Sequence, residues 1–151
     1  MDQTIFQSPV FVAAIISWFL AQALKVPTGY LRTKEVNWAS LLNPGGMPSS
    51  HSSIITATTY GIGLYVGFDS PLFALAFAVA SVVIYDATGI RRQAGIHAEF
   101  INAIIRELAS GKRLEEWEQK KLQEVLGHTP MEAFAGTVLG IVVAQIIWFI
   151  W

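Results

Sequence analysis

The chain has 151 residues, of which 53% are hydrophobic and only 14% are charged, with a formal net charge of −1 and no cysteine. An average soluble domain has about 25% charged residues, so this composition is typical of a protein that resides in a bilayer. The lack of cysteine excludes disulfide and thiol chemistry, and the near-neutral charge gives no reason to expect a nucleic-acid partner.

Four apolar segments approach or reach the roughly 20 residues that cross a hydrocarbon core; they are 8–25, 52–68, 70–90 and 130–151. Three of them open with a hydroxyl residue followed by proline, a pair suited to the N-cap and first turn of a helix; these pairs are Ser8-Pro9, Ser70-Pro71 and Thr129-Pro130. We therefore predict an all-α, polytopic membrane protein in which residues 1–151 form one domain with about four transmembrane helices.

The basic residues indicate the orientation. All ten Lys and Arg residues fall within 25–34 and 91–121, the segments that separate spans one from two and three from four. With four spans these segments lie on the same side of the membrane, and the positive-inside rule assigns that side to the cytoplasm. We expect a multi-pass protein of the cell membrane, with both termini and the 67–70 turn outside.

A basic pair, Lys25 and Arg32, follows the first span at the start of a loop predicted over 26–50, which is rich in turn-forming residues. Held there, Arg32 would bind two phosphate oxygens as a fork and Lys25 would act as a point charge. The alternative is that both are cations that reach from a helix end to the membrane interface.

A polar turn, Pro48-Ser49-Ser50-His51, leads into the second span. Its hydroxyl and backbone N–H groups would bind an anion at the start of a helix, and its imidazole exchanges a proton near neutral pH. A serine-rich N-cap with an interfacial histidine is the simpler alternative.

Asp86 lies near the end of the third span and precedes Arg91 and Arg92. An ionisable side chain within a span is costly and is therefore a functional candidate, most simply as the partner of one of these arginines. A buried ion pair that fixes helix register is the structural alternative. We expect one of the two arginines to reach phosphate as well.

Two amphipathic helices are predicted between the third and fourth spans. Apolar residues recur every fourth position through 94–110, and a second such pattern covers 114–127. The two predict a cytoplasmic helical hairpin, which alternatively lies on the membrane surface.

His128 and Glu132 open the last span four residues apart, a spacing that makes them neighbours on one helix face. The carboxylate would then orient and polarise the imidazole, as in a catalytic dyad. Thr129 and Glu132 also have the spacing of a capping box, which by itself would explain the glutamate. Capping does not explain the histidine.

The order Lys-x6-Arg, Pro-Ser-x-His and His-x3-acid resembles the motifs of the type 2 phosphatidic acid phosphatase and vanadium haloperoxidase superfamily. The stretches 85–92 and 127–132 are more similar to its divergent bacterial and plant branch, and the likeness covers nearly the whole chain. The resemblance implies a metal-independent phosphatase with no cofactor. In that superfamily the C-terminal histidine attacks phosphorus and the Pro-Ser-x-His histidine protonates the leaving oxygen.

Carried to this sequence, His128 resembles the nucleophile, Glu132 the acid that orients it, and His51 the general acid. The phosphate-binding set that the motifs and the neighbouring residues suggest is Lys25, Arg32, Ser49, Ser50 and one of Arg91 and Arg92, with Asp86 in support.

The sequence departs from the superfamily pattern in three places: Thr33 replaces a proline, Ser50 replaces a glycine, and Lys121-Leu122 replace the Ser-Arg expected before the second histidine. That arginine normally contacts phosphate. The expected substrate is a lipid or isoprenoid (pyro)phosphate, with the bilayer as surroundings and a homo-oligomer left open. The alternatives are a non-catalytic phosphate- or lipid-binding or transport protein and a structural membrane subunit.

Overall fold

The structure, a computed structural model, describes residues 5–36, 38–41, 45–109 and 127–151. The regular elements of these residues are all helices, which confirms the predicted all-α class. They are the short helices η1 (Ile5–Gln7) and η2 (Trp38–Leu41) and the helices α1 (Pro9–Thr33), α2 (Ser50–Val66), α3 (Pro71–Thr88), α4 (Ile90–Ala109) and α6 (Pro130–Ile150).

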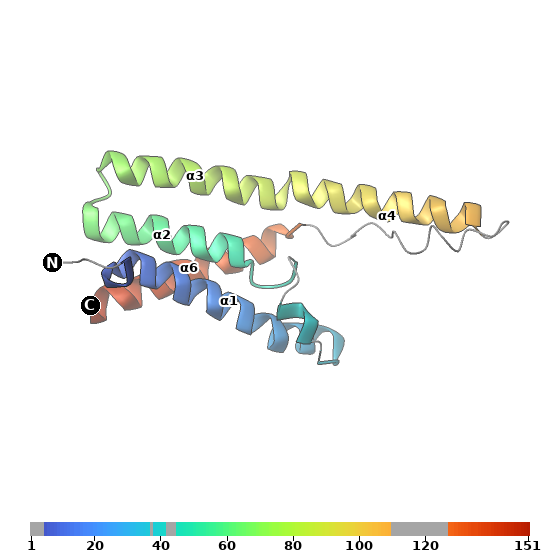
Figure 1. The fold of residues 1–151 in the computed structure, drawn as a ribbon, viewed down its shortest axis with the longest axis horizontal. Coiled ribbons are helices and arrows are strands. Elements are labelled where there is room, and N and C mark those ends of the chain that lie inside the picture. The colour runs from blue at the N-terminus through green and yellow to red at the C-terminus, as the bar shows by residue number, and fades with distance from the viewer. Residues whose placement is uncertain (1–4, 37, 42–44, 110–126) are drawn as a thin grey trace.

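Helices α1 and α3 run in one direction, and α2 and α6 run in the opposite direction (Figure 1). Helices α1, α2 and α6 pack together, α3 lies along α2, and α4 continues from α3 beyond the end of the bundle (Figure 1). Helix α1 begins and α6 ends at one end of this bundle, where the α2–α3 turn also lies, whereas α2 and α6 begin at the opposite end (Figure 1). The residues with predicted chemistry gather at that opposite end.

Three helical stretches of the described residues are long and apolar enough to cross a membrane: Pro9–Leu31, Pro71–Arg106 and Pro130–Ile150. Helix α2 has 17 residues, which is about 25 Å and shorter than the usual spanning length. The sequence predicts this second span to be short. Because α2 packs against α1, α3 and α6, most of its surface faces other helices, as for a short crossing inside a bundle.

The predicted helix starts are confirmed by their capping hydrogen bonds. Ser8 Oγ accepts from the N–H of Phe11 at 3.4 Å, Ser70 Oγ from that of Phe73 at 3.1 Å, and Thr129 Oγ1 from that of Glu132 at 3.3 Å. Each cap satisfies a backbone donor that the helix itself leaves unpaired, which is why these short local patterns fix where a helix begins.

The predicted loop from residue 26 is wrong at its start, because α1 continues through Pro27 to Thr33. Proline removes one backbone donor, and membrane helices tolerate this where a hydroxyl contacts the affected turn. Here Thr28 Oγ1 lies 2.7 Å from the carbonyl oxygen of Leu24. The helix ends at Lys34, whose left-handed backbone (φ 62°) directs its N–H to the carbonyl of Tyr30.

The sequence predicts a span followed by a separate surface helix. In the structure, α3 and α4 instead form a nearly continuous helix. The break is confined to Gly89, whose N–H still donates to the carbonyl of Tyr85 at 2.8 Å. The first predicted amphipathic helix is confirmed as part of α4. The second, over 114–127, lies outside the described residues apart from Gly127, so the hairpin stays a prediction.

Helices α2 and α6 approach closely along a line that we call the α2–α6 seam. It is formed by Gly136 and Gly140 of α6 against Ser49, the N-cap of α2, and Ser52 and Ser53 of α2. A Cβ atom added to Gly136 would overlap the carbonyl oxygen of Ser49, and one added to Gly140 would overlap that of Ser53. Small residues allow membrane helices to approach in this way without any help from the hydrophobic effect. The seam thereby sets the height of α6 relative to the start of α2.

Candidate functional site

The first turn of α6 is joined to two other helices by backbone hydrogen bonds. The N–H of His128 donates to the carbonyl of Ala87 at the end of α3 at 3.0 Å, and the N–H of Ser49 before α2 donates to the carbonyl of Glu132 at 2.9 Å. The residues around His51, Asp86 and His128 are therefore brought to one place by backbone geometry, at the end of the bundle predicted to hold them.

His128 is the most enclosed of the three histidines, with 2% of its surface exposed. Its Nδ1 lies 3.4 Å from Glu132 Oε2, and since a carboxylate only accepts, this contact places a proton on Nδ1. The other ring nitrogen, Nε2, is buried and has no hydrogen-bond partner among the described residues. In the neutral ring that atom carries the lone pair, which is the form in which an imidazole attacks an electrophile.

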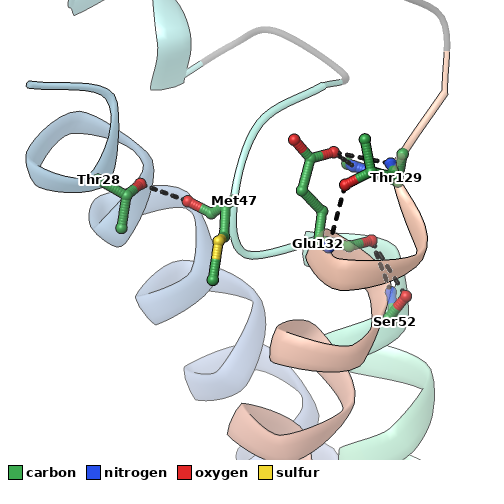
Figure 2. A network of polar contacts seen from close by, with 7 residues as sticks. Thr28, Met47, Ser52, Thr129 and Glu132 are labelled. Carbon is green, nitrogen blue, oxygen red and sulfur yellow. Dashed lines mark hydrogen bonds and ion pairs between the residues drawn. The ribbon is translucent and has the colours of Figure 1, made fainter. Parts of the chain in front are cut away.

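Glu132 serves as a helix cap and as a partner of the histidine at the same time. Its Oε2 also accepts from the N–H of Thr129 at 3.0 Å, while the hydroxyl of Thr129 accepts from the N–H of Glu132, which completes the capping box (Figure 2). The two sequence interpretations of Glu132 are therefore compatible. Its position is fixed by the helix start, and the same oxygen faces the imidazole.

Lys25 lies near Glu132 and lines the same pocket. Only 2% of its surface is exposed, and its positive charge is attracted by the carboxylate of Glu132, the kind of pairing that a buried ammonium group requires. It lines a pocket of about 570 Å³ between α1, the loop before α2 and the start of α6, together with Thr28, Gly29, Leu31, Gly46, Met47, Thr129, Met131 and Glu132.

One hydrogen bond holds the loop beside this pocket. The hydroxyl of Thr28 donates to the carbonyl of Met47 (Figure 2), so the segment that precedes the His51 turn is attached to α1 one turn from Lys25. Sequence reasoning missed Thr28, and the only local signal for it is its place directly after the proline of α1.

His51 and Asp86 lie on the α3 side of the first turn of α6. The ring centroids of His51 and His128 are 6.0 Å apart, and His51 is exposed where His128 is buried. A recess of about 170 Å³ between α2 and α3 is lined by His51 and Asp86 with Val82, Val83 and Ala87. Four of the predicted residues therefore line two separate pockets: Lys25 and Glu132 line one, and His51 and Asp86 line the other. His128 contacts residues of both, Glu132 through its ring and Ala87 through its N–H.

Ser49 and Ser50 are buried at the start of α2. The Ser49 hydroxyl is engaged as the N-cap, where it accepts from the N–H of Ser52 at 3.2 Å and from the hydroxyl of Ser52 at 3.1 Å (Figure 2). Arg32 lies in the last turn of α1 and Arg91 and Arg92 in the first turn of α4. Their side chains lie outside the described part of the chain, so their contact with phosphate stays a prediction.

The profile of the Divergent PAP2 family matches residues 6–143, nearly the whole chain. The chain belongs to the Divergent PAP2 family. A relative from Bacillus subtilis (strain 168), "Uncharacterized membrane protein YuiD", is 39% identical over 144 residues, which are 90% of this chain and 89% of the relative. No solved structure matches the chain. Together with the apolar helices, these findings identify a membrane protein of this PAP2-related family.

Proposed function

We propose that this membrane protein is a phosphatase that hydrolyses a lipid or isoprenoid (pyro)phosphate through a phosphohistidine at His128. The observation that carries the proposal is the state of that side chain. Its Nδ1 faces a carboxylate, whereas its Nε2 is buried without a partner among the described residues. A buried polar atom left unpaired is costly, and an imidazole oriented by an acid is the usual form of a histidine nucleophile or base.

The reaction proceeds in two steps. Nε2 of His128 attacks phosphorus, the bond from phosphorus to the leaving oxygen breaks, and His51 donates its proton to that oxygen so that an alcohol leaves. Water then attacks the phosphohistidine, the P–N bond breaks, its electron pair returns to Nε2, and His51 takes the proton released by the water. Inorganic phosphate leaves and both histidines return to their starting forms. Glu132 stabilises the charge that develops on the His128 ring.

We assign binding of the phosphate group to the pocket that Lys25 and Glu132 line. Lys25 supplies a positive charge with little exposure to water, where electrostatic attraction is stronger than in solvent. The first N–H groups of α2, at Ser50 and His51, point along a helix start and add a positive partial charge. Arg32 and one of Arg91 and Arg92 complete the predicted set.

An amphiphilic substrate suits the lining of the pocket. Leu31, Met47 and Met131 are its exposed apolar members, at 69%, 41% and 64% exposure, while its polar wall contains Lys25 and Glu132. A phosphate held at the polar wall leaves an attached chain next to flexible apolar side chains, and methionine adapts to such chains readily. By the positive-inside rule the site faces the cytoplasm.

Phosphate binding without turnover is the second candidate. It is favoured by Lys121-Leu122, which stand where the superfamily has Ser-Arg. Because Nε2 has no accessible surface, neighbouring side chains must also move before a substrate reaches it.

The experiment is a phosphate-release assay on the full chain, purified in detergent, with phosphatidate and a polyprenyl phosphate. We expect turnover, an acid-labile phosphoenzyme trapped from ³²P-labelled substrate, and inhibition by vanadate, which mimics five-coordinate phosphorus. His128→Asn should abolish both turnover and the trapped label. His97→Asn is the matched control, because His97 is exposed on α4.

Three results decide between the candidates. Retained turnover in His128→Asn contradicts the phosphohistidine. Vanadate binding without turnover in the unmodified protein favours the binding protein. If the unmodified protein neither binds vanadate nor hydrolyses substrate, the phosphate site itself is contradicted.

A further inference from the structure

Asp86 is held in a defined position beside the two histidines. It is on α3 immediately before Ala87, whose carbonyl accepts the N–H of His128 at 3.0 Å. The backbone next to Asp86 therefore cannot shift along the bundle without disturbing the start of α6. The side chain is half-buried, at the end of a helix that is otherwise strongly apolar. A carboxylate in such a place is costly unless it performs a task.

His51 is the histidine that shares a recess with this carboxylate. The recess of about 170 Å³ has Asp86 and His51 as its titratable members, and its remaining lining is apolar: Val82, Val83 and Ala87. His128, at a ring distance of 6.0 Å, faces His51 from α6 and is oriented by Glu132. Lys25 of α1 lines the separate pocket.

We propose that Asp86 is the positioning residue of His51, as Glu132 is for His128, so that each histidine of the site has its own carboxylate. The proposal rests on the proposed function, in which His51 is the proton donor. The negative charge of Asp86 favours the protonated imidazole and holds the ring on the α3 side of His128, while the proton that moves to the leaving oxygen is that of His51.

This assignment separates the two ends of the reacting bond. The phosphoryl oxygens face Lys25 in the α1 pocket, whereas the leaving oxygen faces the α2–α3 recess, where a donor must stand. An in-line displacement requires the nucleophile and the leaving oxygen to be on opposite sides of phosphorus. The carboxylate in the recess therefore affects esters that need a proton on departure and has little effect on those that do not.

The catalytic test compares Asp86→Asn with Asp86→Glu on two substrates. We expect Asp86→Asn to reduce kcat for an alkyl phosphate by about tenfold or more, with KM little changed, and to leave p-nitrophenyl phosphate within about twofold, because its leaving group departs without a proton. Asp86→Glu restores the charge and should recover part of the loss. Asp69→Asn, the same change in the turn at the far end of the bundle, is the control.

A double-variant cycle separates positioning from a structural role. If Asp86 acts through His51, adding Asp86→Asn to His51→Ala produces no further loss on the alkyl ester. Additive losses, or equal losses on the two esters, overturn the proposal and favour an ion pair of Asp86 with an arginine of α4.

A titration decides the same question without turnover. The chain has only three histidines, so their side-chain NMR signals can be assigned by single substitutions in the detergent-solubilised full chain. In Asp86→Asn we expect the His51 signal to titrate at lower pH than in the unmodified protein, since the charge that favoured its protonated form is gone, and the His97 signal to titrate as before.

An unchanged His51 titration overturns the role of Asp86. If the titration moves but the unmodified protein hydrolyses neither ester, the coupling of Asp86 to His51 stands and the proposed function is what fails.

Discussion

The two sides of the first turn of α6 provide different environments for two basic side chains, Lys25 and His51. On the α1 side, Lys25 is 2% exposed and the loop beside it is attached to the helix by Thr28. On the α3 side, His51 is exposed in a small recess. Attraction between charges is strong where water is excluded, and protons exchange readily where water is present. This difference supports the proposal that the α1 side binds phosphate and the α3 side transfers protons.

The largest effect should come from the exposed side. His51→Ala removes a proton donor, a contribution of about 10²- to 10⁴-fold in general acid catalysis, and the loss should appear on alkyl phosphates and be small on p-nitrophenyl phosphate. Measuring kcat for the two esters tests this. Losses of equal size would mean that His51 binds or supports structure, and the division between the two sides would be wrong.

Loss of the buried cation should affect every substrate alike. Lys25→Met keeps the length of the side chain but removes a charge-assisted contact to phosphate, worth about 1.5–3 kcal/mol or roughly ten- to hundredfold. Vanadate affinity and kcat/KM should fall together on both esters. Lys34→Met is the control, because Lys34 is exposed just after α1. Unchanged vanadate affinity in Lys25→Met would remove the α1 pocket from the phosphate site.

The comparison also depends on the placement of α6 by the α2–α6 seam. Gly136→Ala forces a methyl group onto the carbonyl of Ser49 and should destabilise the fold by about 1–3 kcal/mol. Gly29→Ala meets no atom within 4 Å, so it should be neutral or slightly stabilising in a helix. Thermal unfolding in detergent measures both. Equal unfolding temperatures would show that the seam does not fix the site.

The smallest change separates the two roles of Glu132. Glu132→Gln keeps an oxygen for the N–H of Thr129 but loses the negative charge near Lys25 and His128. Turnover should therefore fall, and the unfolding temperature should fall too, because the buried ammonium of Lys25 loses its partner. Glu132→Ala loses the cap as well, at a cost of about 1 kcal/mol. Unfolding temperature and turnover of the two variants are compared. Full turnover in Glu132→Gln would reduce this residue to a cap.

Much of the fold could be predicted because its signals are local. A hydroxyl followed by proline fixes a helix start within four residues, and the caps at Ser8, Ser70 and Thr129 are where the sequence places them. The pairing of His128 with Glu132 follows in the same way, since residues four apart on a helix are neighbours. The end of α1 could not be predicted, because the hydroxyl contacts around Pro27 leave no clear pattern in the sequence.

The chain by itself determined the helical segments, their starting residues and the end of the bundle at which the candidate residues lie, since apolar length, capping patterns and charge distribution are properties of the sequence. Only the tertiary structure decided how these residues divide into two pockets, that Nε2 of His128 is enclosed, and that Ala87 supplies the carbonyl for its N–H. These features depend on how closely α6 approaches α2 and how it is rotated. That geometry results from the absence of side chains at Gly136 and Gly140 and from backbone contacts between distant segments, which no local pattern encodes.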